Sequence, residues 1–365
     1  MNNAEVIGGV PLVSVIGTPR TMGERLGARL KPRLQVLSQY LAEQLCTLSA
    51  SNGQALTPER LRDLIRPSVQ VIARHEPSLW MEFEAMSQAS DVAVEDLLVI
   101  HGYSDLLSFM QCQLPPRPST FVCLDASHTA DGKPCMAFAW YLDPALLPYL
   151  TLMRRIPSHG PATLTLTLAG LHPVAGLSEA GVAVACNELR VRDGACGHFT
   201  SHLLSSMLTA PSLEDALRRG LAAPRHGGGA VHGLAANGER FSLELSGQQA
   251  TRLVDPLAAA PRVHTNHPLD EQLIPTVVLV DATSKSRLED AANLAVGSTG
   301  TTPHTIGEWF GLTREPGSTR IALARTDAEG EHSTDAVVVI VLCPGAGEVH
   351  LRRSGMPGRM ETIKL

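Results

Sequence analysis

The first third of the chain has the hydrophobic spacing of helices. A run of leucines recurs at helical intervals, at Leu34, Leu37, Leu41 and Leu45. Upstream of this run, Thr21 and Glu24 have the spacing of a capping box, which predicts that a helix begins there. Similar patterns predict three further helices, which follow Thr57, surround residues 79–86 and cover residues 91–110.

A proline-rich stretch, QLPPRPSTFVCLD, ends this helical part at residues 113–125. Beyond it, apolar residues alternate with polar ones or form short buried runs, and turns such as Asn237-Gly238 separate several of them. Strands are predicted at residues 7–16, 121–127, 135–142, 162–170, 181–189, 229–236, 240–247, 336–344 and around 348–351, and helices at 212–217 and 284–295. Helices followed by many antiparallel strands predict an α+β fold. In this interpretation, residues 1–118 form a helical N-terminal segment and residues 119–365 form the β-rich core of the same domain.

Composition narrows the function classes. The chain has 365 residues, is 44% hydrophobic and carries a formal charge of −6, so it can bury a large core and lacks a basic surface for nucleic acid. No apolar run approaches the roughly 20 residues of a membrane span, and the N-terminus lacks the basic start of a signal peptide. The seven cysteines are scattered without a CxxC pair, which favours free thiols in the cytoplasm.

Several segments resemble the acyl-coenzyme A:6-aminopenicillanic acid acyltransferase and carcinine hydrolase-like family of N-terminal-nucleophile (Ntn) hydrolases. They are GTPRTMGERLGARL (17–30), ADGKP (130–134), GLSEAGVAVACNEL (176–189), HTNH (264–267) and TSKSR (283–287). The resemblance implies a four-layer αββα sandwich made as a precursor. In such proteins a Cys, Ser or Thr cleaves the chain before itself and then uses its own α-amino group as the base.

The resemblance places the nucleophile in Arg117-Pro118-Ser119-Thr120-Phe121. The family has Gly-Cys-Thr/Ser there, and two alignments put either Pro118 or Ser119 at the Cys position. Only Ser119 can act as a nucleophile, so Ser119 is the predicted catalytic residue and Thr120 a substrate-binding neighbour. The alternative is that both hydroxyls simply begin a strand after a loop. Cys112 and Cys123 are rival nucleophiles, and a buried inert thiol is the default for Cys123.

The resemblance also implies polar partners for the nucleophile. Asn187 occupies the position of an oxyanion-hole or positioning amide, and Asn266 in HTNH is retained. The Gly-Arg/Gln-Asn-x-Asp segment of the family is replaced, so Tyr141 stands where a polar group is usual and Asp143 lies two residues on. We therefore predict Asn187 as a catalytic residue and Tyr141, Asp143 and Asn266 as substrate-binding residues.

Other motifs have simpler interpretations. His264 and His267 could bind zinc, together with His198 and His202, which stand at i and i+4 of a helix, but no carboxylate or cysteine accompanies them at ligand spacing. We therefore predict neither a metal nor a resident cofactor, although acyl-coenzyme A would be a co-substrate of an acyltransferase. The TSKSR residues Thr283, Ser284, Ser286 and Arg287 are predicted to start and cap a helix.

Three hypotheses follow for function. The first is an amide hydrolase or acyltransferase that acts on a small molecule through an acyl-enzyme on Ser119. The second is a relative that does not cleave itself and catalyses a cyclisation or condensation in small-molecule biosynthesis. The third is a binding protein without activity. A small-molecule partner is expected in each case, nucleic-acid and membrane partners are not, and a homo-oligomer is compatible with the sequence.

Overall fold

The fold was described from a computed structural model, which places residues 5–51, 53, 55–222, 224–254, 260–311 and 336–365. These residues form nine α-helices, which are α1 (Pro19–Ser51), α2 (Pro58–His75), α3 (Pro77–Ser90), α4 (Val94–His101), α5 (Tyr103–Phe109), α6 (Thr200–Leu208), α7 (Leu213–Gly220), α8 (Ser284–Val296) and α9 (Pro303–Trp309). The first strands are β1 (Val6–Ile7), β2 (Val10–Gly17), β3 (Ser119–Leu124), β4 (Cys135–Leu142), β5 (Leu150–Pro157), β6 (Thr163–Leu168), β7 (Leu171–Ser178) and β8 (Val182–Val191). The later strands are β9 (Gly228–Ala235), β10 (Arg240–Leu245), β11 (Ala250–Arg252), β12 (Arg262–His264), β13 (Val277–Leu279), β14 (Ala336–Cys343), β15 (Glu348–Arg353) and β16 (Glu361–Lys364).

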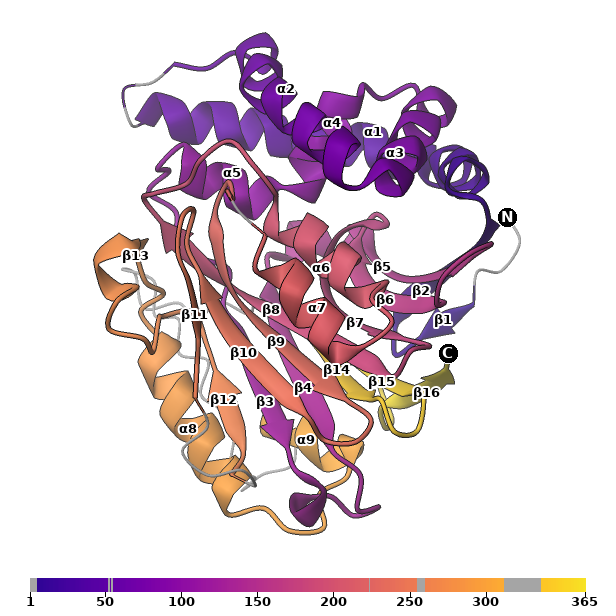
Figure 1. The fold of residues 1–365 in the computed structure, drawn as a ribbon, viewed down its shortest axis with the longest axis vertical. Coiled ribbons are helices and arrows are strands. Elements are labelled where there is room, and N and C mark those ends of the chain that lie inside the picture. The colour runs from indigo at the N-terminus through magenta and orange to yellow at the C-terminus, as the bar shows by residue number, and fades with distance from the viewer. Residues whose placement is uncertain (1–4, 52, 54, 223, 255–259, 312–335) are drawn as a thin grey trace.

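The strands form two sheets. The larger has the order β1-β2-β5-β6-β7-β8-β9-β10-β11, with β13 paired to β8, and the smaller has the order β12-β3-β4-β14-β15-β16. Helices α6 and α7 pack on the outer face of the larger sheet, and α8 and α9 pack on the outer face of the smaller sheet (Figure 1). The predicted α+β class and αββα layering are therefore confirmed. Helices α1–α5 form a further cap over the larger sheet.

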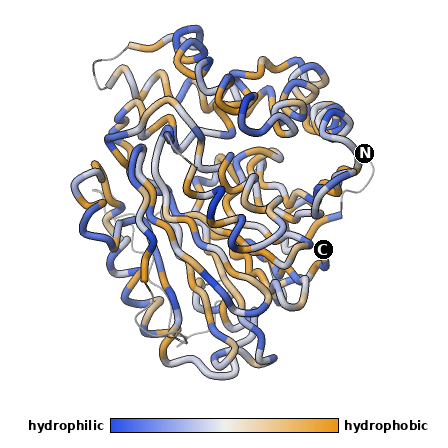
Figure 2. Tube along the Cα trace, viewed as in Figure 1, coloured by the Kyte–Doolittle hydropathy of each residue, from blue (hydrophilic) through white to orange (hydrophobic). Residues whose placement is uncertain are grey.

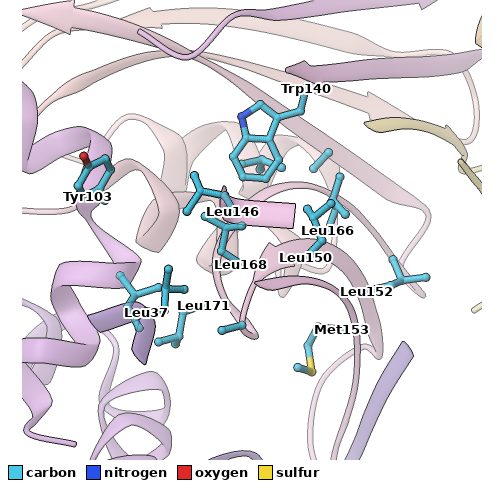
Figure 3. Packing of buried hydrophobic residues seen from close by; sticks show 14 of the residues in the cluster. Leu37, Tyr103, Trp140, Leu146, Leu150, Leu152, Met153, Leu166, Leu168 and Leu171 are labelled. Atoms are coloured by element: carbon cyan, nitrogen blue, oxygen red, sulfur yellow. The ribbon is translucent and has the colours of Figure 1, made fainter. Parts of the chain in front are cut away.

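Strand alternation explains why the two sheets stack. In β4, Met136, Phe138 and Trp140 face the core between the sheets, whereas Ala137 and Tyr141 face the outer layer of α8 and α9. The inner side chains meet leucines of β5, β6 and β7, as Figure 3 shows around Trp140. In Figure 2, hydrophobic residues lie along strands of both sheets.

Each strand predicted in the β-rich part overlaps an observed strand, but the bounds differ and β5, β7, β11, β12, β13 and β16 were not predicted. The strand predicted at residues 121–127 is β3, which ends at Leu124 and is followed by a 3₁₀ turn (Ala126–His128). It forms an antiparallel hairpin with β4, and β9 and β10 form a second one. The predicted first strand is instead divided into β1 and β2, which pair with each other across Gly8-Gly9. Both glycines have positive φ, 55° and 82°, a conformation that suits a tight hairpin turn.

The helices of the cap also differ in detail from the prediction. Helix α1 begins at Pro19, and Thr18 rather than Thr21 accepts the N-terminal hydrogen bond, from the Thr21 amide at 3.3 Å. The predicted capping box is therefore wrong, because Pro19 is already a favourable first residue of a helix. The predicted helix over residues 91–110 is split into α4 and α5 at Gly102.

Residues 1–118 contribute more than a helical segment. Strand β2 joins the larger sheet by parallel pairing with β5, from Leu12 opposite Leu152 to Gly17 opposite Pro157. Across the described residues, no helix combines the length and apolar character that crossing a membrane requires.

Candidate functional site

Ser119 is the first residue of β3, and its side chain points into the space between the two sheets. It lies opposite Trp140 of β4 and is 1% exposed. Alternation along β3 directs Phe121 and Cys123 to the same inner face, and Thr120 and Val122 to the outer face. In the facing sheet, Ala183 and Ala185 of β8 point inward, and this alternation brings Asn187 towards Ser119.

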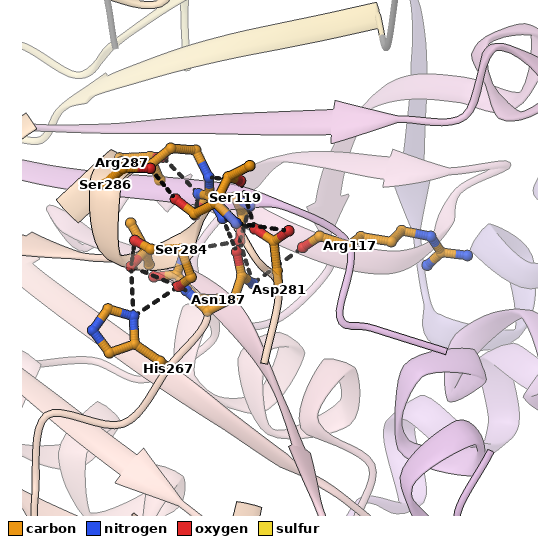
Figure 4. A network of polar contacts seen from close by, with 12 residues as sticks. Arg117, Ser119, Asn187, His267, Asp281, Ser284, Ser286 and Arg287 are labelled. Atoms are coloured by element: carbon orange, nitrogen blue, oxygen red, sulfur yellow. Dashed lines mark hydrogen bonds and ion pairs between the residues drawn. The ribbon is translucent and has the colours of Figure 1, made fainter. Parts of the chain in front are cut away.

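Two side-chain amides hold the Ser119 hydroxyl. Nδ2 of Asn187 donates to Ser119 Oγ at 2.8 Å, and Nδ2 of Asn266 donates to the same oxygen at 3.1 Å (Figure 4). The backbone amide of Ser119 donates to Asn266 Oδ1 at 2.7 Å. Ser119, Asn187 and Asn266, three residues predicted from the sequence, thus form one cluster although they lie on different elements.

A chain of hydrogen bonds sets the orientation of Asn187. Its Oδ1 accepts from His232 Nε2 at 3.1 Å, and His232 Nδ1 lies 2.8 Å from Ser242 Oγ. Burial holds the pKa of His232 well below its ordinary value, so the ring is neutral. Because its Nε2 carries the proton given to Asn187, its Nδ1 accepts from Ser242, and the amide nitrogen of Asn187 is directed at Ser119. The ring of Phe121 stacks on His232 with centroids 3.8 Å apart and fixes the plane of the imidazole.

Asn266 is held by the helix that follows it. Its backbone amide donates to Ser284 Oγ at 2.8 Å, at the first residue of α8. Its Nδ2 also donates to the carbonyl oxygens of Arg117 and Glu188, each at 3.1 Å. The side chain therefore joins the segment before Ser119, the strand β8 and the start of α8 at one point.

The buried guanidinium of Arg287 closes the site from the α8 side. It donates to the Ser119 carbonyl oxygen at 2.6 Å, to Asn266 Oδ1 at 3.0 Å and to Thr120 Oγ1 at 3.0 Å. Asp281 accepts from Arg287 and supplies the balancing charge. A paired and fully hydrogen-bonded guanidinium is the form in which a buried charge is tolerated.

Two predicted substrate-binding residues lie on the other face of the sheet. Thr120 and Tyr141 point to the outer layer, where the Arg287 guanidinium lies 5.8 Å from the Tyr141 ring centroid. Burial raises the pKa of Tyr141 to about 12, against the opposing effect of Arg287, so its hydroxyl stays protonated. The Thr120 and Tyr141 side chains therefore point away from the Ser119 hydroxyl, because adjacent strand positions point to opposite faces.

Asp143 lies beyond the end of β4. Its Oδ1 accepts from the Ala145 amide at 2.8 Å and caps a 3₁₀ turn (Pro144–Tyr149) at the surface. Among the hydrogen bonds of the described residues, none links Asp143 to Ser119. The rival nucleophiles Cys112 and Cys123 are both buried, and burial raises the pKa of Cys112, which opposes thiolate formation.

The peptide bond before Ser119 is also fixed in place. The carbonyl oxygen of Pro118 accepts from the Tyr141 amide at 3.0 Å. One residue earlier, the Arg117 amide donates to Glu188 Oε2 at 3.1 Å. Burial raises the pKa of Glu188, but the Arg117 and Arg190 guanidiniums outweigh it and hold that pKa below its ordinary value. The carboxylate that anchors this segment is therefore ionised.

Sequence reasoning did not find Arg287, Asp281 or His232 as parts of this site. Helix α8 begins at Ser284 as predicted, but Arg287 binds the Ser119 region rather than capping the helix. The signal available was the segment DATSKSR (281–287), in which three hydroxyl residues lie between one acidic residue and two basic ones. For His232, the buried apolar strand around it gave no sign of a polar partner in the facing sheet.

The histidines considered as metal ligands have other contacts. His264 Nε2 lies 2.8 Å from Glu244 Oε1, and His267 Nδ1 lies 2.7 Å from Ser284 Oγ. His198 and His202 have ring centroids 5.3 Å apart in the core. Within the described residues, no three His, Cys, Asp or Glu side chains are grouped as metal ligands would be.

Comparison with known proteins adds little to this geometry. No protein-family model matches the chain, and no curated protein matches it either. Among solved structures, the chain is similar to a mutant form of the conjugated bile acid hydrolase from Clostridium perfringens, at 13% identity and a TM-score of 0.47, over 68% of this chain and 92% of that chain. A second variant of the same hydrolase is similar at 11% identity and a TM-score of 0.44, over 67% of this chain and 92% of that chain. Likeness at this level says nothing about the substrate of the present chain.

Proposed function

We propose that the chain cleaves itself between Pro118 and Ser119 and then uses Ser119 to hydrolyse or transfer the acyl group of a small amide. The supporting observation is the double amide contact on Ser119 Oγ, from Asn187 at 2.8 Å and Asn266 at 3.1 Å. A serine that only began a strand would not need two buried amides from separate elements directed at its hydroxyl.

In the cleavage step, Ser119 Oγ attacks the Pro118 carbonyl carbon and its proton passes to the Ser119 nitrogen. The C–N bond breaks as the ester forms, and water then hydrolyses the ester to leave a free α-amino group on Ser119. The Tyr141 amide, 3.0 Å from the Pro118 oxygen, is placed to stabilise the negative charge on that oxygen in the tetrahedral intermediate.

After cleavage, the Ser119 nitrogen becomes the base for the second reaction. Asn266 Oδ1, which accepts from this nitrogen at 2.7 Å, keeps it beside Oγ. Arg287 lies on the same Asn266 oxygen at 3.0 Å, and its positive charge favours the neutral form of the amine. A neutral amine with a reference pKa of about 7.7–8.0 is suited to take the proton from Oγ near neutral pH.

Asn187 has a separate role in the acyl transfer. When Oγ bonds to the substrate carbonyl carbon, negative charge develops on the oxygen attached to that carbon, close to the amide of Asn187. The hydrogen bond from His232 prevents the side-chain amide of Asn187 from flipping, so its N–H groups remain directed at the reacting atoms. Loss of one such donor typically lowers the rate by about 10²–10³.

The first test is the intact mass of the purified protein. Cleavage predicts two chains, the larger beginning at Ser119, and a single mass in the Ser119→Ala variant. Thr120→Ala is the matched control, since Thr120 points to the outer face and should still allow cleavage. A single mass of 38.9 kDa in the wild type would refute the self-cleaving mechanism.

A second candidate function, ligand binding without hydrolysis, is supported by one observation. Ser119 is 1% exposed, and no base among the described side chains accepts its hydroxyl proton. In that case the wild type stays uncut, and a panel of small N-acyl amides is bound without release of product. Turnover that disappears in Ser119→Ala would exclude this alternative.

A further inference from the structure

Two cysteines lie opposite each other on neighbouring strands of the smaller sheet. Strand β14 pairs antiparallel with β4, and the register places Leu342 opposite Met136. The next pair in the same register is Cys343 opposite Cys135, at the end of β14 and the start of β4 (Figure 1). Both side chains belong to the outer layer with α8 and α9. The pair is therefore separate from the Ser119 side chain, which lies on the inner face.

The backbone hydrogen bonds of β4 show how close the two cysteines are. The Tyr141 amide donates to the Pro118 carbonyl oxygen, on the β3 side of the strand. The backbone groups of successive strand residues point to alternate edges, so those of Cys135 also point to β3 and not to β14. Cys135 and Cys343 thus form a non-hydrogen-bonded pair, in which the Cα atoms are about 4.5 Å apart. Disulfide bonds span Cα separations of about 4.4–6.8 Å, so the two sulfurs could be joined without moving the strands.

The surroundings favour the thiolate form of Cys343 over that of Cys135. Hydrogen bonds from Cys135 and then His350 hold the pKa of the Cys343 thiol below its ordinary value. The hydrogen bond to Cys343, together with burial, raises the pKa of Cys135. His350 lies on β15, where its Nδ1 is 2.8 Å from Thr362 Oγ1 and the ring is held in place. Since the thiolate is the nucleophilic form, Cys343 is the attacking sulfur and Cys135 the second one.

The pair lies just inside the surface. Cys343 is 7% exposed and Cys135 is 4% exposed. The exposed residues 131–133 precede β4, and a turn at residues 344–347 follows β14. A small oxidant can reach sulfurs at this depth, whereas a bulky disulfide reagent would first have to open the turn. Oxidisable cysteines are typically thiolates of this kind with a second cysteine beside them.

We propose that Cys343 and Cys135 form an oxidation site for hydrogen peroxide. The Cys343 thiolate attacks one peroxide oxygen, the O–O bond breaks, hydroxide leaves, and Cys343 becomes a sulfenic acid. The sulfur of Cys135 then attacks the Cys343 sulfur, the S–O bond breaks, and the Cys135 proton leaves with the hydroxyl group as water. Two thiols are oxidised to one disulfide, and one peroxide is reduced to two waters once the hydroxide is protonated. A thiol reductant reverses the change by exchange.

This oxidation does not depend on the chemistry proposed for Ser119. Both cysteines lie within residues 119–365, so the disulfide forms within one product whether or not the chain is cleaved. The bond would join β4 to β14 at the open end of both strands, where the printed register of the two strands ends at Leu342.

The test treats the purified protein with hydrogen peroxide, denatures it and counts the free thiols with dithiobis(nitrobenzoic acid). The count should fall by two from the seven of the reduced protein, and dithiothreitol should restore it. Proteolysis without reduction should yield a pair of peptides joined through Cys135 and Cys343. Retention of all seven thiols, or a disulfide that joins other cysteines, would overturn the proposal.

Single substitutions separate the two sulfurs. In Cys135→Ser, Cys343 should stop at the sulfenic acid, which dimedone captures, whereas Cys343→Ser should form no disulfide and no dimedone adduct at Cys135. Cys46→Ser is the matched control, because Cys46 is more exposed but burial, Glu59 and Glu43 raise its pKa, and the loss of two thiols should remain. A dimedone adduct at Cys135 in Cys343→Ser, with none at Cys343 in Cys135→Ser, would overturn the assigned order of attack.

Discussion

The buried imidazole of His202 should make the stability of the fold depend on pH. The side chain is 0% exposed in the middle of α6, and neither ring nitrogen has a partner among the described residues. Burial, with smaller effects from His198 and His75, lowers its pKa from 6.5 to about 3. The unfolded chain therefore binds a proton between about pH 6.5 and pH 3 that the folded chain does not bind.

The size of the effect follows from proton linkage. A folded-state pKa below the unfolded value contributes stability that is present above about pH 6.5 and is lost as the pH falls. At pH 5, with an unfolded pKa of about 6.5, His202 alone should lower the free energy of unfolding by about 2 kcal/mol relative to pH 8. His202→Leu removes this loss, and at pH 8 it also removes two unpartnered polar atoms, so we expect it to be at least as stable as the wild type.

The assay is urea denaturation of both proteins at pH 8 and pH 5. The stability of His202→Leu relative to the wild type should increase by about 2 kcal/mol between the two pH values. Leu204→Met, on the same helix, changes packing without changing a titrating group. Its stability relative to the wild type should therefore be the same at pH 8 and at pH 5. If the His202→Leu difference also stays constant with pH, His202 does not titrate as the structure requires and the reasoning is refuted.

Three further substitutions test other parts of the molecule. Arg287→Met should lower the free energy of unfolding by about 3–5 kcal/mol in denaturation experiments, because Asp281 would remain buried without its partner, whereas equal stability would contradict the role of the pair. Gly23→Ala should destabilise the protein despite the better helix propensity of alanine, because the new Cβ would lie 2.2 Å from the Glu82 carbonyl oxygen. Glu24→Ala, at an exposed position of the same helix, is its control, and a higher melting temperature for Gly23→Ala would contradict the close approach of α1 and α3. Burial raises the pKa of Asp105 to about 7, so the contribution of this carboxyl to stability is lost as the pH rises from 4 to 7, and the stability of Asp105→Asn relative to the wild type should increase by about 3 kcal/mol over that range; a difference that does not vary with pH would count against an ionising carboxyl in the folded state.

Local patterns predicted the elements well because most of them carry their own signals. Continuous apolar runs in β4 and β14, and turns such as Asn237-Gly238, depend on neighbouring residues and identify strands directly. The prediction failed where two local signals competed. The Thr21–Glu24 spacing predicted a helix start at Thr21, but α1 begins at Pro19. Likewise, hydrophobicity alone predicted one continuous strand at residues 7–16, but the turn at Gly8-Gly9 divides it into β1 and β2.

The site was harder to predict because it depends on which face each residue occupies. Ser119, Asn187 and Asn266 were identified by resemblance, but their meeting required strand β8 of one sheet to face β3 of the other. Tyr141 and Asp143 were predicted because they stand at or near the Gly-Arg/Gln-Asn-x-Asp segment of the family that the chain resembles. The end of β4 and the alternation of its side chains direct them elsewhere.

Strand β2 has a consequence for the cleavage proposed above. It comes from the N-terminal side of the Pro118–Ser119 bond yet pairs with β5, which comes from the other side. Leu37 and Tyr103 likewise pack in one core with Trp140 and Leu168 (Figure 3). The two products would therefore stay interlocked as a single particle. Size-exclusion chromatography under native conditions would give the same elution volume before and after cleavage, and only separation in denaturant would reveal the break.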